Sequence, residues 1–348
     1  MPHMLVTGGA GFIGSHAALH FAQRGYTVTV LDNLSRGELL QRPDPNALFN
    51  WNHLADGAGI ERVRGDVRDA ATVDALAARA DVILHAAAQT AVTTSVRDPE
   101  TDFLCNALGT FRVLDAARRG GRRPTVLFCS TNKVYGDNVN SIGVEAGEGR
   151  YRFPASWAQG VPETFSVDRC EHTPYGCSKL TGDLYVQDFG HLYGLRVGVF
   201  RMSCIYGTRQ FGMEDQGWVA WFVIAALAGR PLTIFGDGRQ VRDVLWIDDL
   251  VSAYEAFIEH GKGVEVFNMG GGPEQTLSLL ELLEVIAEAT GIRPAVTYAD
   301  WRPSDQKVYV SDIRRARERL GWTPAVTPRA GVQRLIEWTR AHAALFRA

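Results

Sequence analysis

The stretch MLVTGGAGFIG, residues 4–14, decides the fold of this chain. Its first residues are apolar and predict a buried strand, and the sequence that follows it predicts a helix. Gly8 allows a sharp turn out of the strand, Gly11 leaves no Cβ between the backbone and a pyrophosphate, and Gly14 lets the helix pack closely on the strand. The helix N-terminus offers free N–H groups and a partial positive charge to such an anion. We therefore predict a dinucleotide-binding βαβ unit at the start of the chain.

A second predicted strand, residues 27–31, ends in Asp32, which lies 18 residues after Gly14. A carboxylate at this place accepts hydrogen bonds from an adenosine ribose and repels a 2′-phosphate. The sequence therefore predicts NAD rather than NADP. Arg36 keeps NADP open as the alternative, since a nearby arginine can bind the additional phosphate.

Strand and helix patterns alternate through the first half of the chain. A strand near residues 62–67 contains Asp66, which we interpret as an adenine contact or as the N-cap of a helix over 70–79. The strand over 82–85 continues into small residues that let the backbone pass beside a cofactor. This alternation predicts an α/β fold with a Rossmann-type doubly wound parallel sheet.

The bulk properties are those of an ordinary globular protein. The chain has 348 residues, 46% of them hydrophobic and 22% charged, with a net charge of −3. This balance gives no reason to expect nucleic acid as a partner. The sequence has no membrane-length apolar run and begins with a strand rather than a signal peptide, which predicts a cytoplasmic protein without a membrane partner. The five cysteines lack paired metal-ligand spacing and predict reduced thiols and no metal.

The predicted chemistry lies at the end of the strand over 125–129 and on a later helix. The strand continues into Ser130 and Thr131, and Tyr175 stands four residues before Lys179, so both face one side of a helix. Oxidation of an alcohol requires a base, and free tyrosine has a pKa of about 10. A lysine ammonium and a cationic nicotinamide would lower that pKa. The alternative is a packed tyrosine and a solvated lysine.

The alternation breaks after a strand over 196–201. We predict one domain from residues 1–202 plus about 240–270, the NAD-binding Rossmann domain. Residues from about 203–239 plus 271–348 are expected to form a smaller C-terminal α/β domain that binds the substrate.

These motifs together resemble the extended short-chain dehydrogenase/reductases of the nucleotide-sugar epimerase and dehydratase group. The resemblance is carried by the glycine motif, residues 32–35 and 65–67, the Tyr175/Lys179 pair and residues 242–243. It implies Thr131, Tyr175 and Lys179 as the catalytic residues. The expected contacts with NAD are Gly8, Gly11, Phe12, Ile13, Gly14, Asp32, Asn33, Ser35, Arg36, Asp66, Val67, Ala86, Ala88, Gln89, Tyr175 and Lys179.

Within that group, residues 130–137, residues 206–211 with 215–218, and residues 238–245 are similar to a branch that epimerises a CDP-sugar at C2. This resemblance implies an isomerase with a tightly held NAD, a transient 2-keto sugar, and a homo-oligomer. Two features depart from the pattern: Lys307 stands where related chains have an arginine, and Cys204 follows Ser203. Guanidinium groups suit the substrate diphosphate, although each arginine could instead form a surface salt bridge. The expected substrate contacts are Thr131, Asn132, Lys133, Arg209, Gln210, Arg242 and Arg302.

Two enzymatic alternatives and one non-enzymatic alternative remain. A 4-epimerase or a 4,6-dehydratase would have the same fold, but a dehydratase has an Asp-Glu pair where this chain has Asn132 and Lys133. A dinucleotide-binding redox sensor would typically lack the Tyr175/Lys179 pair.

Overall fold

The computed structural model of the chain describes residues 1–39, 46–302 and 305–346. The chain forms two compact units, each built from three segments. Unit 1 comprises Met1–Val134, Thr173–Arg201 and Val251–Phe267. Unit 2 comprises Tyr135–His172, Met202–Leu250 and Asn268–Ala348. The domain boundaries given above stay a prediction.

A seven-stranded sheet has the order β12-β8-β5-β4-β1-β2-β3. Pairing is parallel between β1 and β2, β1 and β4, β2 and β3, and β4 and β5. This arrangement confirms the predicted α/β class. The order reverses between β1 and β4, which is where open sheets of this type bind ligands. The strands are β1 (His3–Thr7), β2 (Thr27–Asp32), β3 (Ile60–Arg64), β4 (Val82–His85), β5 (Thr125–Thr131), β8 (Val197–Met202) and β12 (Val264–Met269).

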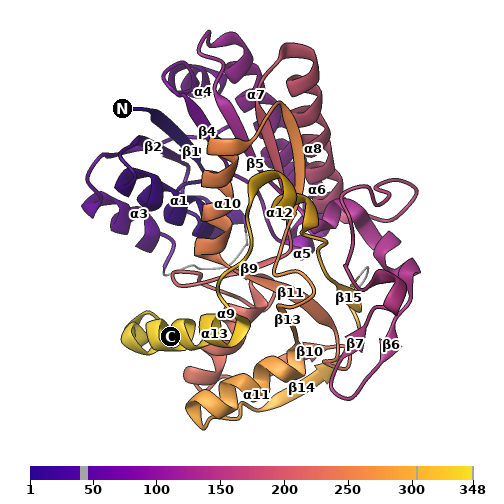
Figure 1. Ribbon diagram of the computed structural model, residues 1–348. Coiled ribbons are helices and arrows are strands. Elements are labelled where there is room, and N and C mark those ends of the chain that lie inside the picture. The colour runs from indigo at the N-terminus through magenta and orange to yellow at the C-terminus, as the bar shows by residue number, and fades with distance from the viewer. Residues whose placement is uncertain (40–45, 303–304, 347–348) are drawn as a thin grey trace. The chain divides into compact units, whose positions relative to one another are not determined.

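Helices cover the unit 1 sheet in two layers (Figure 1). α4 (Ala70–Ala77), α7 (Gly109–Arg119) and α8 (Thr173–Tyr193) pack together, and their buried side chains join those of the strands in one hydrophobic cluster. α1 (Phe12–Gln23) packs on β1 and β2. His20 of α1 lies 3.0 Å from Glu255 of α10 (Ile247–His260). The shorter helices are α2 (Arg36–Leu39), α3 (Phe49–His53), α5 (Val92–Arg97) and α6 (Pro99–Phe103).

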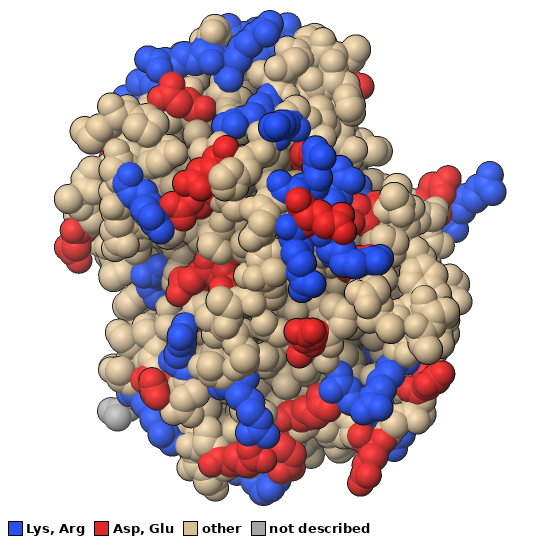
Figure 2. Space-filling model, viewed as in Figure 1, with Lys and Arg blue, Asp and Glu red and all other residues tan. Residues whose placement is uncertain are grey.

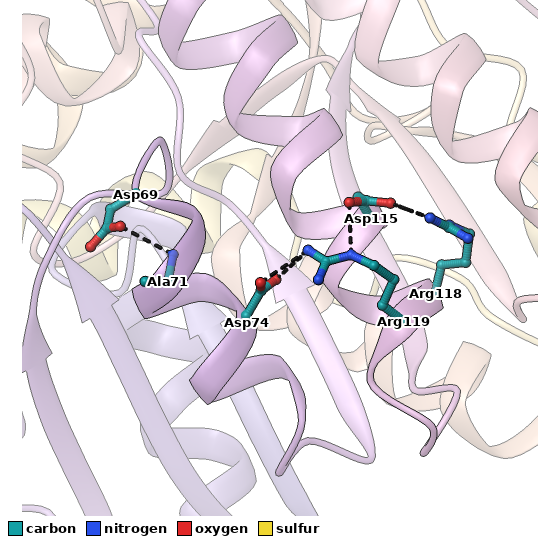
Figure 3. A network of polar contacts seen from close by, with 6 residues as sticks. All are labelled: Asp69, Ala71, Asp74, Asp115, Arg118 and Arg119. Atoms are coloured by element: carbon teal, nitrogen blue, oxygen red, sulfur yellow. Dashed lines mark hydrogen bonds and ion pairs between the residues drawn. The ribbon is translucent and has the colours of Figure 1, made fainter.

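The N-cap of one helix differs from the sequence prediction. The N-cap of α4 is Asp69, not Asp66: its carboxylate accepts a hydrogen bond of 3.1 Å from the Ala71 amide (Figure 3). α7 begins at Gly109, because the preceding residues Leu104–Leu108 form a π-helix. Such insertions are rare and are frequent at functional sites.

Unit 2 is built from small sheets and surrounding helices. β11 (Val241–Trp246) pairs with β9 (Cys204–Tyr206), β13 (Thr276–Ser278) and β15 (Val308–Tyr309), and β10 (Leu232–Phe235) pairs with β14 (Val296–Ala299). The helices are α9 (Trp218–Leu227), α11 (Leu279–Thr290), α12 (Arg314–Leu320) and α13 (Pro328–Ala341).

The buried carboxylate of Asp243 stabilises the meeting point of the unit 2 strands. It accepts hydrogen bonds from the amides of Gly272 and Ser311 and from the hydroxyl of Ser203. The segment after β5 contains a 3-10 segment over Asn132–Ile142 and a hairpin of β6 (Glu145–Ala146) with β7 (Tyr151–Arg152).

The surface carries charges of both signs. Figure 2 shows Lys and Arg side chains interspersed with Asp and Glu side chains over the visible face. In the described ranges, no helix has both the length and the hydropathy needed to cross a bilayer. None of the five cysteines, all of which are described, forms a disulfide.

Candidate active site

The turn between β1 and α1 has the geometry that a pyrophosphate-binding loop requires. Gly8 has a φ of +72°, and a Cβ there would lie 2.6 Å from the Ala87 amide nitrogen. A Cβ on Gly14 would lie 2.3 Å from the Gly8 carbonyl oxygen. Gly11 is the N-cap of α1 and provides no side-chain cap, so the first-turn N–H groups of α1 are suited to an anion. The described turn therefore fits a dinucleotide. Phe12 and Ile13 form the first positions of α1.

Asp32 lies at the end of β2, directly beside this turn. Its carboxylate accepts hydrogen bonds from the Ala10 amide (2.9 Å) and the Leu34 amide (2.8 Å). Burial raises its pKa above the ordinary value, and those two hydrogen bonds oppose the rise. Arg36 is the first residue of α2. The predicted ribose-binding carboxylate thus lies next to the glycine turn.

Asp66 follows β3 and lies beside the loop after β2. Its carboxylate accepts hydrogen bonds from Arg68 and from Asn33 Nδ2 (2.9 Å). The hydrogen bond from Arg68 is the largest cause that lowers the pKa of Asp66 to about 2. Asn33 in turn accepts from the amide and hydroxyl of Ser35. The neighbouring Val67 side chain would lie 2.9 Å from a Cβ on Gly109, so it packs against the start of α7.

The wall opposite the glycine turn is the segment after β4. The Ala86 amide donates to the Thr7 carbonyl, which fixes this segment against the end of β1. Ala88 is half-buried, and Gln89 is fully buried. The Gln89 side chain donates hydrogen bonds to Asp102 and to the Ala91 carbonyl. Both hydrogen bonds donated by the Gln89 side chain are therefore made to other protein groups.

The three predicted catalytic side chains gather at the end of β5. Thr131 is the last residue of β5, and Tyr175 and Lys179 lie on the first turns of α8. Burial raises the pKa of Tyr175 to about 12, while a hydrogen bond with the Thr131 side chain lowers it. Burial lowers the pKa of Lys179 to about 8, and its Nζ lies 4.3 Å from the centre of the Phe128 ring.

The pKa of Tyr175 differs from the sequence expectation of a lowered value. Burial is the largest influence, and among the described residues no cationic side chain outweighs it. A lowered pKa would require a positive charge at the site, which a nicotinamide ring supplies when NAD is bound.

The two residues after Thr131 contact its hydroxyl. The Lys133 amide donates to Thr131 Oγ1 at 3.2 Å, and Thr131 Oγ1 lies 3.3 Å from Asn132 Oδ1. These contacts fix the direction of the hydroxyl that faces Tyr175.

Asn106 is a buried residue of this site that the sequence reasoning missed. It lies in the π-helix Leu104–Leu108, and its amide group bonds both the N–H (2.8 Å) and the carbonyl (3.0 Å) of Gln89. Its Nδ2 also lies 3.0 Å from Ser178 Oγ on α8. The only sequence signal is a polar residue among apolar ones. Asn106 therefore connects the segment after β4, at Gln89, to α8, at Ser178.

The arginines proposed to bind the diphosphate lie in unit 2. Arg242 on β11 forms an ion pair of 2.8 Å with Asp305, and its side chain is 11% exposed. Arg302 pairs with Asp215 at 3.1 Å and lies over the Phe235 ring. Both arginines thus form the intramolecular ion pairs that were the alternative interpretation.

Arg209 follows β9 in a left-handed conformation, with a φ of +57°. Burial lowers its pKa to about 10, and Asp248 opposes this shift. Gln210 Nε2 donates to the Ile205 carbonyl. Between Arg302 and Lys307, residues 303 and 304 lie outside the described residues.

Comparison with known proteins agrees with this geometry. Residues 4–270 match the NAD dependent epimerase/dehydratase family. The chain is 37% identical to CDP-paratose 2-epimerase of Salmonella typhi, over 97% of this chain and 98% of the relative. It is 34% identical to dTDP-glucose 4,6-dehydratase of Streptomyces antibioticus, over 97% of this chain and 92% of the relative.

A solved structure of Thermus thermophilus UDP-glucose 4-epimerase in complex with NAD superposes with a TM-score of 0.77 at 31% identity. The match covers 97% of this chain and 99% of that one. The predicted cofactor, NAD, is confirmed by the family and its solved members. The chain therefore belongs to the NAD-dependent epimerase/dehydratase family.

Proposed function

We propose that the chain is an NAD-dependent nucleotide-sugar 2-epimerase that converts CDP-paratose, or a close analogue, to the CDP-tyvelose type of product. The observation that carries the proposal is the contact of Thr131 with Tyr175, one helical turn from Lys179, at the end of β5. The similarity to CDP-paratose 2-epimerase over 97% of the chain supports the C2 position and the CDP group.

In this mechanism Tyr175 holds and moves the proton of the sugar hydroxyl. Its phenolate oxygen takes the C2 hydroxyl proton, while the Thr131 hydroxyl orients the same oxygen atom of the sugar. NAD bound beside the glycine turn would supply the hydride acceptor for C2 and the hydride donor for the opposite face of the ketone. Tyr175 then gives the proton back to the new alkoxide.

Lys179 supports the base through its charge. With a pKa of about 8 it is mostly protonated at pH 7. An ammonium beside Tyr175 favours the phenolate, and it would also bind the nicotinamide ribose.

The nucleotide diphosphate is proposed to bind Arg209, Arg242 and Arg302. The Arg242 guanidinium, paired with Asp305, is largely buried, and its planar fork would suit phosphate oxygens. Strong contacts to the diphosphate and few contacts to the sugar would let the keto sugar rotate and present its other face between the two hydride transfers. We also propose a cytoplasmic location and a homo-oligomeric assembly.

The second candidate is a 4-epimerase or 4,6-dehydratase, favoured by the 34% identity to dTDP-glucose 4,6-dehydratase. Asn132 and Lys133 argue against dehydration, because neither supplies the carboxylic acid that would protonate the departing hydroxyl group. A redox sensor is less favoured still, because the Thr131, Tyr175 and Lys179 side chains are gathered as catalysis requires.

The test is the fate of the C2 hydrogen during turnover. Protein purified without added cofactor should release NAD on denaturation. Incubated with CDP-paratose in deuterated water, it should form the epimer without deuterium at C2, because the hydride returns from the cofactor. Deuterium at C2 would indicate proton abstraction, and a product changed at C4 would establish the second candidate.

The nucleotide preference has a separate test. Thermal shift of the purified protein with CDP, UDP, GDP or dTDP should give the largest stabilisation with CDP. A larger stabilisation with another of these nucleotides would contradict the CDP assignment.

A further inference from the structure

The Asp66 carboxylate, shortly after the end of β3, accepts four hydrogen bonds from other groups of the protein. Its Oδ1 accepts from the Arg68 amide at 2.8 Å and from Arg68 Nε at 2.9 Å. Its Oδ2 accepts from Arg68 Nη2 at 2.7 Å and from Asn33 Nδ2 at 2.9 Å. An ionised carboxylate has about four lone-pair sites, so these donors occupy all of them.

This saturation matters for the expected contact between Asp66 and adenine. The hydrogen bond from Asn33 places Asp66 beside the loop after β2, and that loop follows Asp32, the expected ribose contact. Adenine would approach the carboxylate with its exocyclic amino group, which is a hydrogen-bond donor. An amino group that bonds Asp66 must therefore replace one of the four donors already present.

The Arg68 side chain is the donor that can leave most easily. Asn33 is fixed at its other end, because its Oδ1 accepts from the Ser35 amide at 3.0 Å and from the Ser35 hydroxyl at 2.7 Å. The Arg68 amide belongs to the turn before α4, in which the Asp69 amide donates to the Asp66 carbonyl. The Arg68 side chain, in contrast, is 40% exposed, and in the described part of the chain Asp66 is its ion-pair partner.

We propose that Arg68 sets how strongly the cofactor site prefers adenine, because its guanidinium and the adenine amino group compete for the Asp66 carboxylate. A hypoxanthine base has a carbonyl oxygen in place of the amino group. That oxygen accepts hydrogen bonds, so it does not require Arg68 to leave Asp66. Arg68 should therefore reduce the preference for NAD over nicotinamide hypoxanthine dinucleotide. This proposal rests on the expected adenine contact of Asp66 and does not depend on the sugar substrate.

A competition between the two dinucleotides tests the proposal in the purified full-length protein. The protein is incubated with an excess of both dinucleotides until the bound composition is constant, and the nucleotides released on denaturation are separated by chromatography. Arg68→Met should raise the bound ratio of NAD to the hypoxanthine dinucleotide about threefold, since an exposed ion pair contributes on this order. An unchanged ratio would overturn the proposal. A lowered ratio would also overturn it and would mean that Arg68 holds Asp66 in place for adenine.

Arg79→Met is the matched control for the loss of an exposed arginine. Arg79 Nη2 pairs with Glu61 Oε2 at 2.8 Å, and both side chains are half-exposed. Glu61 lies near the start of β3, whereas Asp66 follows its end. The lost positive charge affects both dinucleotides alike, so the bound ratio in Arg79→Met should equal that of the wild type. A rise as large as that in Arg68→Met would overturn the proposal.

The Asp66→Asn background tests whether the effect of Arg68 passes through the carboxylate. An asparagine has one acceptor oxygen and no charge to hold the guanidinium. Arg68→Met should then change the bound ratio by less than about 1.5-fold, because the two substitutions act on one interaction. An equal change in both backgrounds would overturn the proposal. None of these measurements uses a sugar, so their outcome is independent of whether the protein epimerises CDP-paratose.

Discussion

At the scale of single residues, the environment of Tyr175 controls whether this protein can act as a base. Burial raises the pKa of the phenol to about 12, and the hydrogen bond with Thr131 opposes the rise only in part. The phenolate therefore depends on the positive charge that a bound nicotinamide would supply. This dependence would couple base strength to the presence of the cofactor.

Replacing this phenol should separate chemistry from binding. Tyr175→Phe should lower kcat of the proposed epimerisation by about 10³-fold, because general-base catalysis contributes on this order. NAD released from the purified variant should match the wild type. Tyr185→Phe, on the exposed side of the same helix, is the matched control and should keep full activity. An active Tyr175→Phe variant would mean that another group is the base.

That Tyr175 and Lys179 lie together on one helix could be predicted, because spacing on a helix is local information. Tyr175 and Lys179 share a helix face wherever the helix packs. Asn106 and Asp102 could not be predicted in the same way, since their contacts with Gln89 and Ser178 join residues 13 to 72 positions apart. No pattern within one helix or strand carries such a tertiary network.

At the scale of secondary-structure elements, the β1–α1 turn combines backbone conformation with close packing. Gly8 needs a left-handed φ and has no space for a side chain. Gly25 also has a left-handed φ, of +84°, but a Cβ added there would have nothing within 4 Å. A substitution at Gly25 therefore tests the energetic cost of the left-handed conformation alone, and one at Gly8 adds the cost of a steric clash.

Gly25→Ala should lower the free energy of unfolding by about 1–2 kcal/mol, the cost of a left-handed alanine. Gly8→Ala should cost clearly more and should also abolish retention of NAD, because the methyl group displaces the segment at Ala86 and Ala87. Urea unfolding and the NAD content of the purified proteins measure both effects. Equal stability losses with NAD retained in both variants would contradict the close approach at Gly8.

The start of α4 gives a second test at this scale. Asp69→Ala should lower the free energy of unfolding, because the Ala71 amide loses its cap. Asp74→Ala, in the same helix, removes only the exposed contact with Arg119 in Figure 3 and should cost less. Urea unfolding measures both variants. A larger loss for Asp74→Ala would contradict the cap assignment.

Element boundaries were the less predictable part of the fold. The strands came from apolar runs with clear limits, but the π-helix before α7 continues a helical pattern and has no periodicity of its own. Likewise, the two-residue strands β6 and β7 are too short to leave a pattern in the sequence.

At the scale of the whole molecule, the buried His85 connects pH to folding. Its Nδ1 lies 2.7 Å from Thr7 Oγ1 and its Nε2 lies 3.0 Å from Thr110 Oγ1. Thr110 Oγ1 donates to the Asn106 carbonyl, so it accepts from Nε2–H, and Nδ1 accepts from Thr7. This network suits the neutral ring, and burial lowers the pKa of His85 to about 3 from its usual 6.5.

A lowered pKa in the folded state makes stability depend on pH in one direction. Below pH 6.5 the unfolded chain takes up a proton that the folded chain refuses, so the free energy of unfolding should fall by up to about 5 kcal/mol as pH drops from 6.5 towards 3. His85→Gln should flatten the profile measured by urea unfolding across this range. His260→Gln, at an exposed site, should leave the profile as it is. A profile unchanged by His85→Gln would contradict the assignment.

The chain alternates between the two units, and this order has a consequence for synthesis. The first five sheet strands, β1 to β5, all lie in the first 131 residues and occupy adjacent places in the sheet. Only β8 and β12 come later, and both add to the β5 edge. A nascent chain on the ribosome can therefore form the glycine turn, Asp32 and the segment after β4 before the later strands are synthesised. Tyr175 and Lys179, on α8, emerge after that part of the sheet can form. Truncated nascent chains should accordingly contain a dinucleotide cradle before they contain a catalyst.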